Sequence, residues 1–179
     1  HIRYEKIEGA QQEEEAAQTD GAGISLSEMA AAQDVQQQEQ QNADTWPKTF
    51  TVTLGGDTTL GSTDDLRKRD DCFENVAAEK GYGWFFSGLQ TLFATDDLTL
   101  INFEGTLTDE TSKKQKLYNF KGPAEYADIL TLGSVEAVNV ANNHTLDYGQ
   151  QGKEDTIANL EAAGIIVSGG GQLGIFEKN

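Results

Sequence analysis

The chain has 179 residues, a formal net charge of −17 and a single cysteine, Cys72. This length suits one domain of ordinary size, and one cysteine excludes an internal disulfide. The acidic excess argues against nucleic acid or an anionic membrane surface as a partner, because both need basic patches. No apolar run approaches the ~20 residues that a membrane-spanning helix needs.

Residues 1–48 differ in composition from the rest of the chain. They are rich in Gln, Glu and Ala, and large apolar side chains are sparse. Such a segment buries too little surface to offset its conformational entropy, so we predict a disordered stalk or linker. The same composition favours helix, which leaves a solvated helix as the alternative. Pro47 marks the boundary, and an α/β domain is predicted over residues 49–179.

Two β-rich segments each lead into an acidic residue. Residues 49–54 alternate between polar and apolar side chains and predict a strand that runs into two glycines and Asp57. Glycines let the chain turn sharply and would present Asp57 at the carboxyl end of that strand. An Asp that bonds its own backbone in a turn is the alternative. Residues 98–103 predict a second strand, which is followed by Glu104.

The segments around the second strand are less regular. Apolar residues recur at helical spacing within residues 64–80 and 84–94, and Trp84 is expected in the core. Residues 106–120 are polar and predict an irregular loop or a hairpin. Its lysines, which include Lys116, are expected at a solvated edge, with contact to an anionic substrate as the alternative.

The last third of the chain continues the alternation of helices and strands. An apolar run over residues 135–140 predicts a buried strand, and it ends in Asn142, Asn143 and His144. A polar loop with a surface histidine is the alternative for this sequence. Further elements are predicted as helices over 123–132 and 152–163 and as a strand over 165–167.

Three predicted strands thus deliver polar side chains to one place. The element order is an α/β pattern, in which ligands usually bind at the carboxyl ends of the strands. We therefore expect Asp57, Glu104, Asn143 and His144 to converge in one pocket. Oxygen donors with one imidazole suit a divalent metal such as Mn²⁺, Fe²⁺ or Zn²⁺.

The segments GGDTTLG, INFEGTLT and VNVANNHTLDYGQQG, in this order and at these spacings, resemble the bacterial poly-γ-glutamate capsule biosynthesis family (CapA-like). The resemblance covers about residues 49–174. It implies an α-β-β-α sandwich of the calcineurin-like metallophosphoesterase type. It also implies that Asp57, Glu104 and Asn143 are metal ligands, and that His144 is catalytic as a general acid or a stabiliser of the transition state.

The sequence departs from the family pattern in two ways. Thr59 stands where phosphatases place a histidine, and the family continues beyond Asn179 with further histidine motifs. The chain is therefore expected to hold only the N-terminal part of the domain. Because affinity depends on how many ligands are present, we expect metal binding to be weak or absent in this fragment and activity to be negligible.

The resemblance implies a role in the synthesis, transfer or cleavage of a capsule polymer, with an acidic polymer or a small anionic substrate as the partner. Two alternatives stay open: a non-catalytic, surface-anchored domain that binds the polymer, and a generic metal-dependent phosphoesterase. The implied location is extracellular or at the cell surface, with a membrane anchor outside this sequence.

Overall fold

The computed structural model describes residue 33 and residues 49–177. The predicted stalk over residues 1–48 lies outside the described residues except at Gln33, which is helical and exposed. The described residues from Thr51 onward belong to one compact unit. No helix in this part of the chain is long and apolar enough to cross a bilayer.

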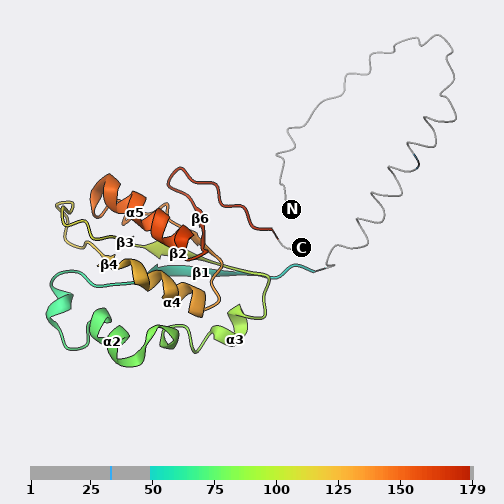
Figure 1. Ribbon diagram of the computed structural model, residues 1–179, viewed down its shortest axis with the longest axis horizontal. Helices are drawn as coiled ribbons and strands as arrows, with labels where there is room; N and C mark the ends of the chain where they lie inside the picture. Colours follow the sequence, from blue (N-terminus) through green and yellow to red (C-terminus); the bar gives the residue numbers. More distant parts are fainter. Residues whose placement is uncertain (1–32, 34–48, 178–179) are drawn as a thin grey trace, which may run out of the picture. The chain divides into compact units, whose positions relative to one another are not determined.

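A four-stranded parallel sheet forms the centre of this unit (Figure 1). Its strands are β1 (Val52–Thr59), β2 (Leu98–Glu104), β5 (Ala137–Asn139) and β6 (Ile166–Ser168), in the order β1-β2-β5-β6. All three neighbouring pairs are parallel. The predicted α/β class is therefore confirmed, whereas the two-sheet sandwich stays a prediction.

The connections between the strands contain the helices. They are α2 (Phe73–Lys80), α3 (Gln90–Phe93), α4 (Ala127–Leu132) and α5 (Gly149–Ala162), with three 3₁₀ turns at Leu66–Lys68, Tyr82–Trp84 and Ala124–Tyr126. A second, small sheet pairs β3 (Thr106–Leu107) with β4 (Lys121–Gly122) in parallel. Of the two alternatives predicted for residues 106–120, the irregular loop is confirmed and the hairpin is wrong, because a hairpin joins antiparallel strands.

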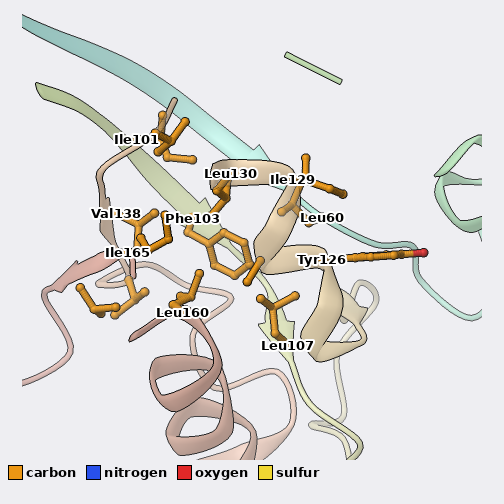
Figure 2. Packing of buried hydrophobic residues seen from close by; sticks show 14 of the residues in the cluster. Leu60, Ile101, Phe103, Leu107, Tyr126, Ile129, Leu130, Val138, Leu160 and Ile165 are labelled. Atoms are coloured by element: carbon orange, nitrogen blue, oxygen red, sulfur yellow. The ribbon is translucent and has the colours of Figure 1, made fainter. Parts of the chain in front are cut away.

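The hydrophobic core lies on one face of the parallel sheet. Ile101 and Phe103 of β2 are buried, and Ile101 is in register with Val138 and then with Val167. When each new strand is added at the same edge of a parallel sheet through a right-handed crossover, the connecting helices lie on the same face of the sheet. Figure 2 shows Phe103 among buried residues of the same cluster, which include Leu130 of α4 and Leu160 of α5.

The opposite face of the sheet is more exposed among the described residues. Leu54 on β1 is 73% exposed, and its register partner Leu100 is half-buried. Alternating burial along β2 gives the same result, since every second side chain of that strand is only half-buried. The sheet is therefore packed on one side by its own helices.

The segment over residues 84–94 differs from its prediction as a core helix. Trp84 is 51% exposed, and only Phe93 of this segment belongs to the buried core. Gly88 interrupts the stretch and Gly83 lies directly before it, and the stretch forms short turns and the four-residue α3. Glycine is a poor helix former, so the apolar spacing does not produce one continuous buried face. Cys72 is buried at 5% exposure.

The carboxylate of Glu74, at the start of α2, is expected to make the stability of the fold depend on pH. Its carboxylate accepts hydrogen bonds from the Ser62 backbone at 3.1 Å and from Arg67 Nε at 2.9 Å. Burial raises the pKa of Glu74, but these hydrogen bonds outweigh burial and hold the pKa below its ordinary value. A lowered pKa in the folded state adds stability at neutral pH, and this stability is lost as the pH falls through the folded-state pKa.

We therefore expect Glu74→Gln to lower the free energy of unfolding by about 1–2 kcal/mol at pH 7. The difference from wild type should shrink as the pH falls below 4. Urea unfolding at several pH values measures both effects. Glu79→Gln on the same helix is the control, because Glu79 is exposed. A difference that stays constant down to pH 3 would contradict this assignment.

Candidate functional site

Asp57 lies near the carboxyl end of β1, on an irregular part of the strand. The pairing of β1 with β2 shifts between Leu54 and Asp57. A Cβ atom at Gly55 would lie 2.8 Å from Ile101 Cγ2, so this position needs glycine for the two strands to approach closely. β1 continues to Thr59, and Asp57 therefore lies inside the strand rather than after it. Its side chain is exposed.

A row of amide side chains connects Asp57 to the loop after β5. Asn102 Nδ2 donates to Asp57 Oδ1 at 2.7 Å. Asn102 Oδ1 in turn accepts from Asn139 Nδ2 at 3.0 Å and from Asn142 Nδ2 at 3.1 Å. Asn142 Nδ2 also donates to the carbonyl of Phe103 at 2.7 Å. This network joins the carboxyl ends of β1, β2 and β5.

Glu104 is the last residue of β2 and is half-buried. It lies opposite Thr59 in the register between β1 and β2. Within residues 49–177, no hydrogen bond or ion pair joins its carboxylate to Asp57, Asn143 or His144. The structure thus places Glu104 at the same edge of the sheet as Asp57 but outside the amide network.

The loop that carries Asn143 and His144 is held by its own side chains. The backbone N–H of His144 donates to Asn142 Oδ1 at 2.9 Å, and the N–H of Asn142 donates to Thr145 Oγ1 at 3.2 Å. Thr145 Oγ1 also donates to the carbonyl of Val140. Local bonds of this kind fix a turn without regular secondary structure. Asn143 is exposed, and its carbonyl accepts from Lys116 Nζ at 3.0 Å.

His144 lies against the fully buried carboxylate of Asp147. His144 Nδ1 is 2.9 Å from Asp147 Oδ2, and the Phe120 ring centroid is 4.8 Å from the imidazole centroid. An ionised carboxylate only accepts hydrogen bonds, so this shorter contact favours the tautomer with a proton on Nδ1, in which the Lys116 ammonium, 3.3 Å from the same nitrogen, does not donate to it. The ring is thereby oriented, and Nε2 becomes the atom available to exchange a proton or to bind a ligand.

Asp147 is surrounded by several donors. Its side chain is 0% exposed, its Oδ1 forms an ion pair with Lys116 Nζ, and its Oδ2 accepts from the Phe120 backbone at 2.7 Å. The Asp147 carbonyl accepts from the Lys114 backbone at 2.8 Å. The irregular loop that precedes β4 is therefore attached to the turn that carries His144.

Sequence reasoning missed Asp147, Lys116 and Asn102 as members of this site. Lys116 is an exposed residue, as expected for a solvated edge, but its ammonium also pairs with the buried carboxylate of Asp147. The spacing of three residues between His144 and Asp147 was a usable signal, since such residues lie close together in a turn. The sequence offered no comparable signal for Lys116 or Asn102.

The donor set suits a divalent cation in kind but not in number. Asp57, Glu104 and Asn143 supply oxygen atoms, which hard cations prefer. Within the described ranges, however, no group of three or more His, Cys, Asp or Glu side chains is placed to hold a metal ion. The described residues therefore do not form a complete metal site, and the assignment of these three residues as ligands stays a prediction.

The fold and this edge define an α/β protein with a parallel sheet and a polar candidate site at the carboxyl ends of its strands. Residues 51–174 match the model of the family described as "Bacterial capsule synthesis protein PGA_cap". The chain belongs to this family, and the resemblance seen in the sequence is confirmed.

Two relatives agree with this family. The chain is 30% identical over 100 residues to the PGA biosynthesis protein CapA of Bacillus subtilis. The matched region covers 55% of this chain and 26% of that protein. It is 32% identical over 150 residues to a probable polyglutamine synthesis accessory protein of Mycobacterium tuberculosis. That matched region covers 70% of this chain and 40% of the relative. The chain thus spans less than half the length of these two curated relatives.

Proposed function

We propose that this chain takes part in the synthesis, transfer or cleavage of a poly-γ-glutamate capsule polymer at the cell surface, and that it handles the polymer at the carboxyl edge of its sheet. Family membership and the names of the relatives support the polymer. The observation that carries the site is the network from Asp57 through Asn102 to Asn142, which fixes the loop of Asn143 and His144 to the sheet.

Within this proposal the residues have separate roles. The imidazole of His144, oriented by Asp147, would give or take a proton at Nε2. Asp57, Glu104 and Asn143 would contribute part of the oxygen ligands of a divalent metal, Mn²⁺, Fe²⁺ or Zn²⁺. When bound, such an ion polarises a substrate oxygen. Residues outside the described part would have to complete its coordination.

A second candidate is a non-catalytic domain that binds the polymer. Thr59 at the end of β1 favours it, because a threonine hydroxyl is a poorer metal ligand than an imidazole. The same polar edge would then hold the acidic polymer through amide and lysine donors without changing it.

Metal titration of the full-length natural protein separates these roles. We expect Asp57→Ala to weaken Mn²⁺ binding by at least about tenfold, because it removes a charged ligand. His144→Ala should largely keep the metal but reduce turnover of a γ-glutamyl substrate roughly 100- to 10,000-fold, because its role is proton transfer. Calorimetry and a turnover assay measure the two effects.

Glu161→Ala is the matched control, because this exposed carboxylate lies near the C-terminal end of α5. Equal loss of Mn²⁺ in the Asp57 and His144 variants would make His144 a ligand. Polymer binding without metal or turnover in the wild type would establish the non-catalytic candidate. Turnover of an aryl phosphate alone would indicate a generic phosphoesterase instead.

A further inference from the structure

A cavity of about 460 Å³ lies beside the candidate site. Its lining comes from the end of β5, the loop that carries Asn143, the first turns of α5 and the glycine-rich segment after β6. Val140 and Leu146 provide apolar walls, whereas Asn143, Gln150 and Lys153 provide polar groups. Apolar walls with a few polar groups are typical of small-molecule sites.

The glycine-rich segment fits closely against the other walls. Gly169, Gly170 and Gly171 all have positive φ, a conformation that favours glycine. A Cβ atom at Gly169 would lie 2.5 Å from Asn139 Oδ1, and one at Gly170 would lie 3.2 Å from Lys153 Cε. The segment therefore packs against both the amide network and the stem of Lys153.

Lys153 gives the cavity a positive charge with a fixed position. Its side chain is half-buried, and its ammonium donates to the carbonyl of Gly170. No carboxylate of residues 49–177 forms an ion pair with it. The nearby acid Glu154 instead accepts from Gln150 Nε2 at 2.9 Å. An ammonium has three donors, so two remain for a ligand.

These groups fit one unit of an acidic aliphatic chain. A γ-linked glutamyl unit carries one free carboxylate and two methylene groups in its backbone. The carboxylate would accept charge-assisted hydrogen bonds from Lys153, and the methylene groups would lie against Val140 and Leu146. Asn143 lines this cavity and also belongs to the candidate site, so a bound unit would lie next to the polar edge.

We propose that this cavity is a binding subsite for a carboxylate-bearing γ-glutamyl unit, with Lys153 as its cation. The inference rests on the proposed function and deepens it, because it adds a place where the polymer is held beside the reacting edge. It also gives a role to an ammonium that has no acidic partner among residues 49–177.

Calorimetric titration of a short γ-glutamate oligomer into the full chain tests the subsite. We expect Lys153→Met to weaken binding roughly tenfold or more, since a hydrogen bond to a charged group is lost, and Lys153→Arg to retain most of the affinity. Leu146→Trp should weaken binding by filling the cavity. Lys68→Met is the control, because it removes the same charge at an exposed site. Thermal unfolding verifies that each variant is folded.

The outcomes separate the subsite from the proposed function. Oligomer binding that is unchanged in Lys153→Met and Leu146→Trp would overturn the subsite and leave the function standing. Equal weakening by Lys68→Met would show that only net charge matters and would also overturn the subsite. Glutarate, a small dicarboxylate, is titrated as a second probe. If glutarate binds in a way that depends on Lys153 but the oligomer does not bind, the carboxylate site stands and the polymer is refuted as the ligand. Binding of neither probe would overturn both.

Discussion

Replacing Asp147 with alanine is expected to lower the free energy of unfolding by about 2–4 kcal/mol. Asp147 is completely buried. Its carboxylate forms an ion pair with Lys116, contacts His144 Nδ1 and accepts a hydrogen bond from the Phe120 backbone N–H. Removing the carboxylate leaves the Lys116 ammonium without its partner and the N–H of Phe120 without its acceptor. The Lys116 side chain is 31% exposed and can be solvated again, so the cost comes mainly from the buried N–H of Phe120, which loses its acceptor, and from the buried volume that is removed.

Chemical denaturation of the full chain measures this loss. Asp109→Ala is the matched control, since Asp109 is an exposed aspartate on the same irregular loop as Lys116, and it should change stability by less than about 0.5 kcal/mol. Asp147→Asn should cost less than Asp147→Ala, because an amide oxygen still accepts from Phe120. If the two alanine variants lost equal stability, the buried cluster would have no structural role.

Replacing Phe103 with alanine is expected to cost about 3–5 kcal/mol of unfolding free energy. Phe103 is 1% exposed and lies in the centre of the core on the helix-covered face of the sheet (Figure 2). The substitution removes most of a ring from a close-packed interior and leaves a cavity. It also loosens the strand whose carbonyl at position 103 accepts from Asn142.

Leu54→Ala provides the matched comparison on the opposite face of the same sheet. Leu54 is 73% exposed, so its truncation should cost less than about 0.5 kcal/mol. Urea unfolding of both variants, at constant protein concentration, gives the two values. A loss for Leu54→Ala close to that of Phe103→Ala would contradict burial on a single face of the sheet.

The regular elements could be predicted from the sequence because their signals are local. The apolar run predicted as a strand over 98–103 forms β2 (Leu98–Glu104), and the helix predicted over 152–163 forms α5 (Gly149–Ala162). The exposed Trp84 was not predictable in this way, because helical spacing does not show that Gly83 and Gly88, on either side of Trp84, break the chain into short turns. Whether a parallel or an antiparallel partner joins β3 also depends on the tertiary fold.

The residues of the candidate site could be predicted only in part from the sequence, because many of their contacts are not local. Asp57, Asn143 and His144 follow from strand ends and turn residues along the sequence. Asn102 was not singled out, because its importance comes from bonds to Asp57 and Asn142 on other strands and loops. The exposure of Lys116 was expected, but its ion pair was not, because its partner Asp147 lies on another loop.

The order of the strands has a consequence for how the chain acquires its structure. Each strand of the parallel sheet pairs with the one that precedes it among the four, so the spatial order β1-β2-β5-β6 repeats the order of synthesis. No strand has to leave a gap for a later one, and the segment between paired strands becomes shorter from the first pair to the last. Closing shorter segments costs less entropy. The sheet can therefore grow from β1 outwards while the chain emerges from the ribosome.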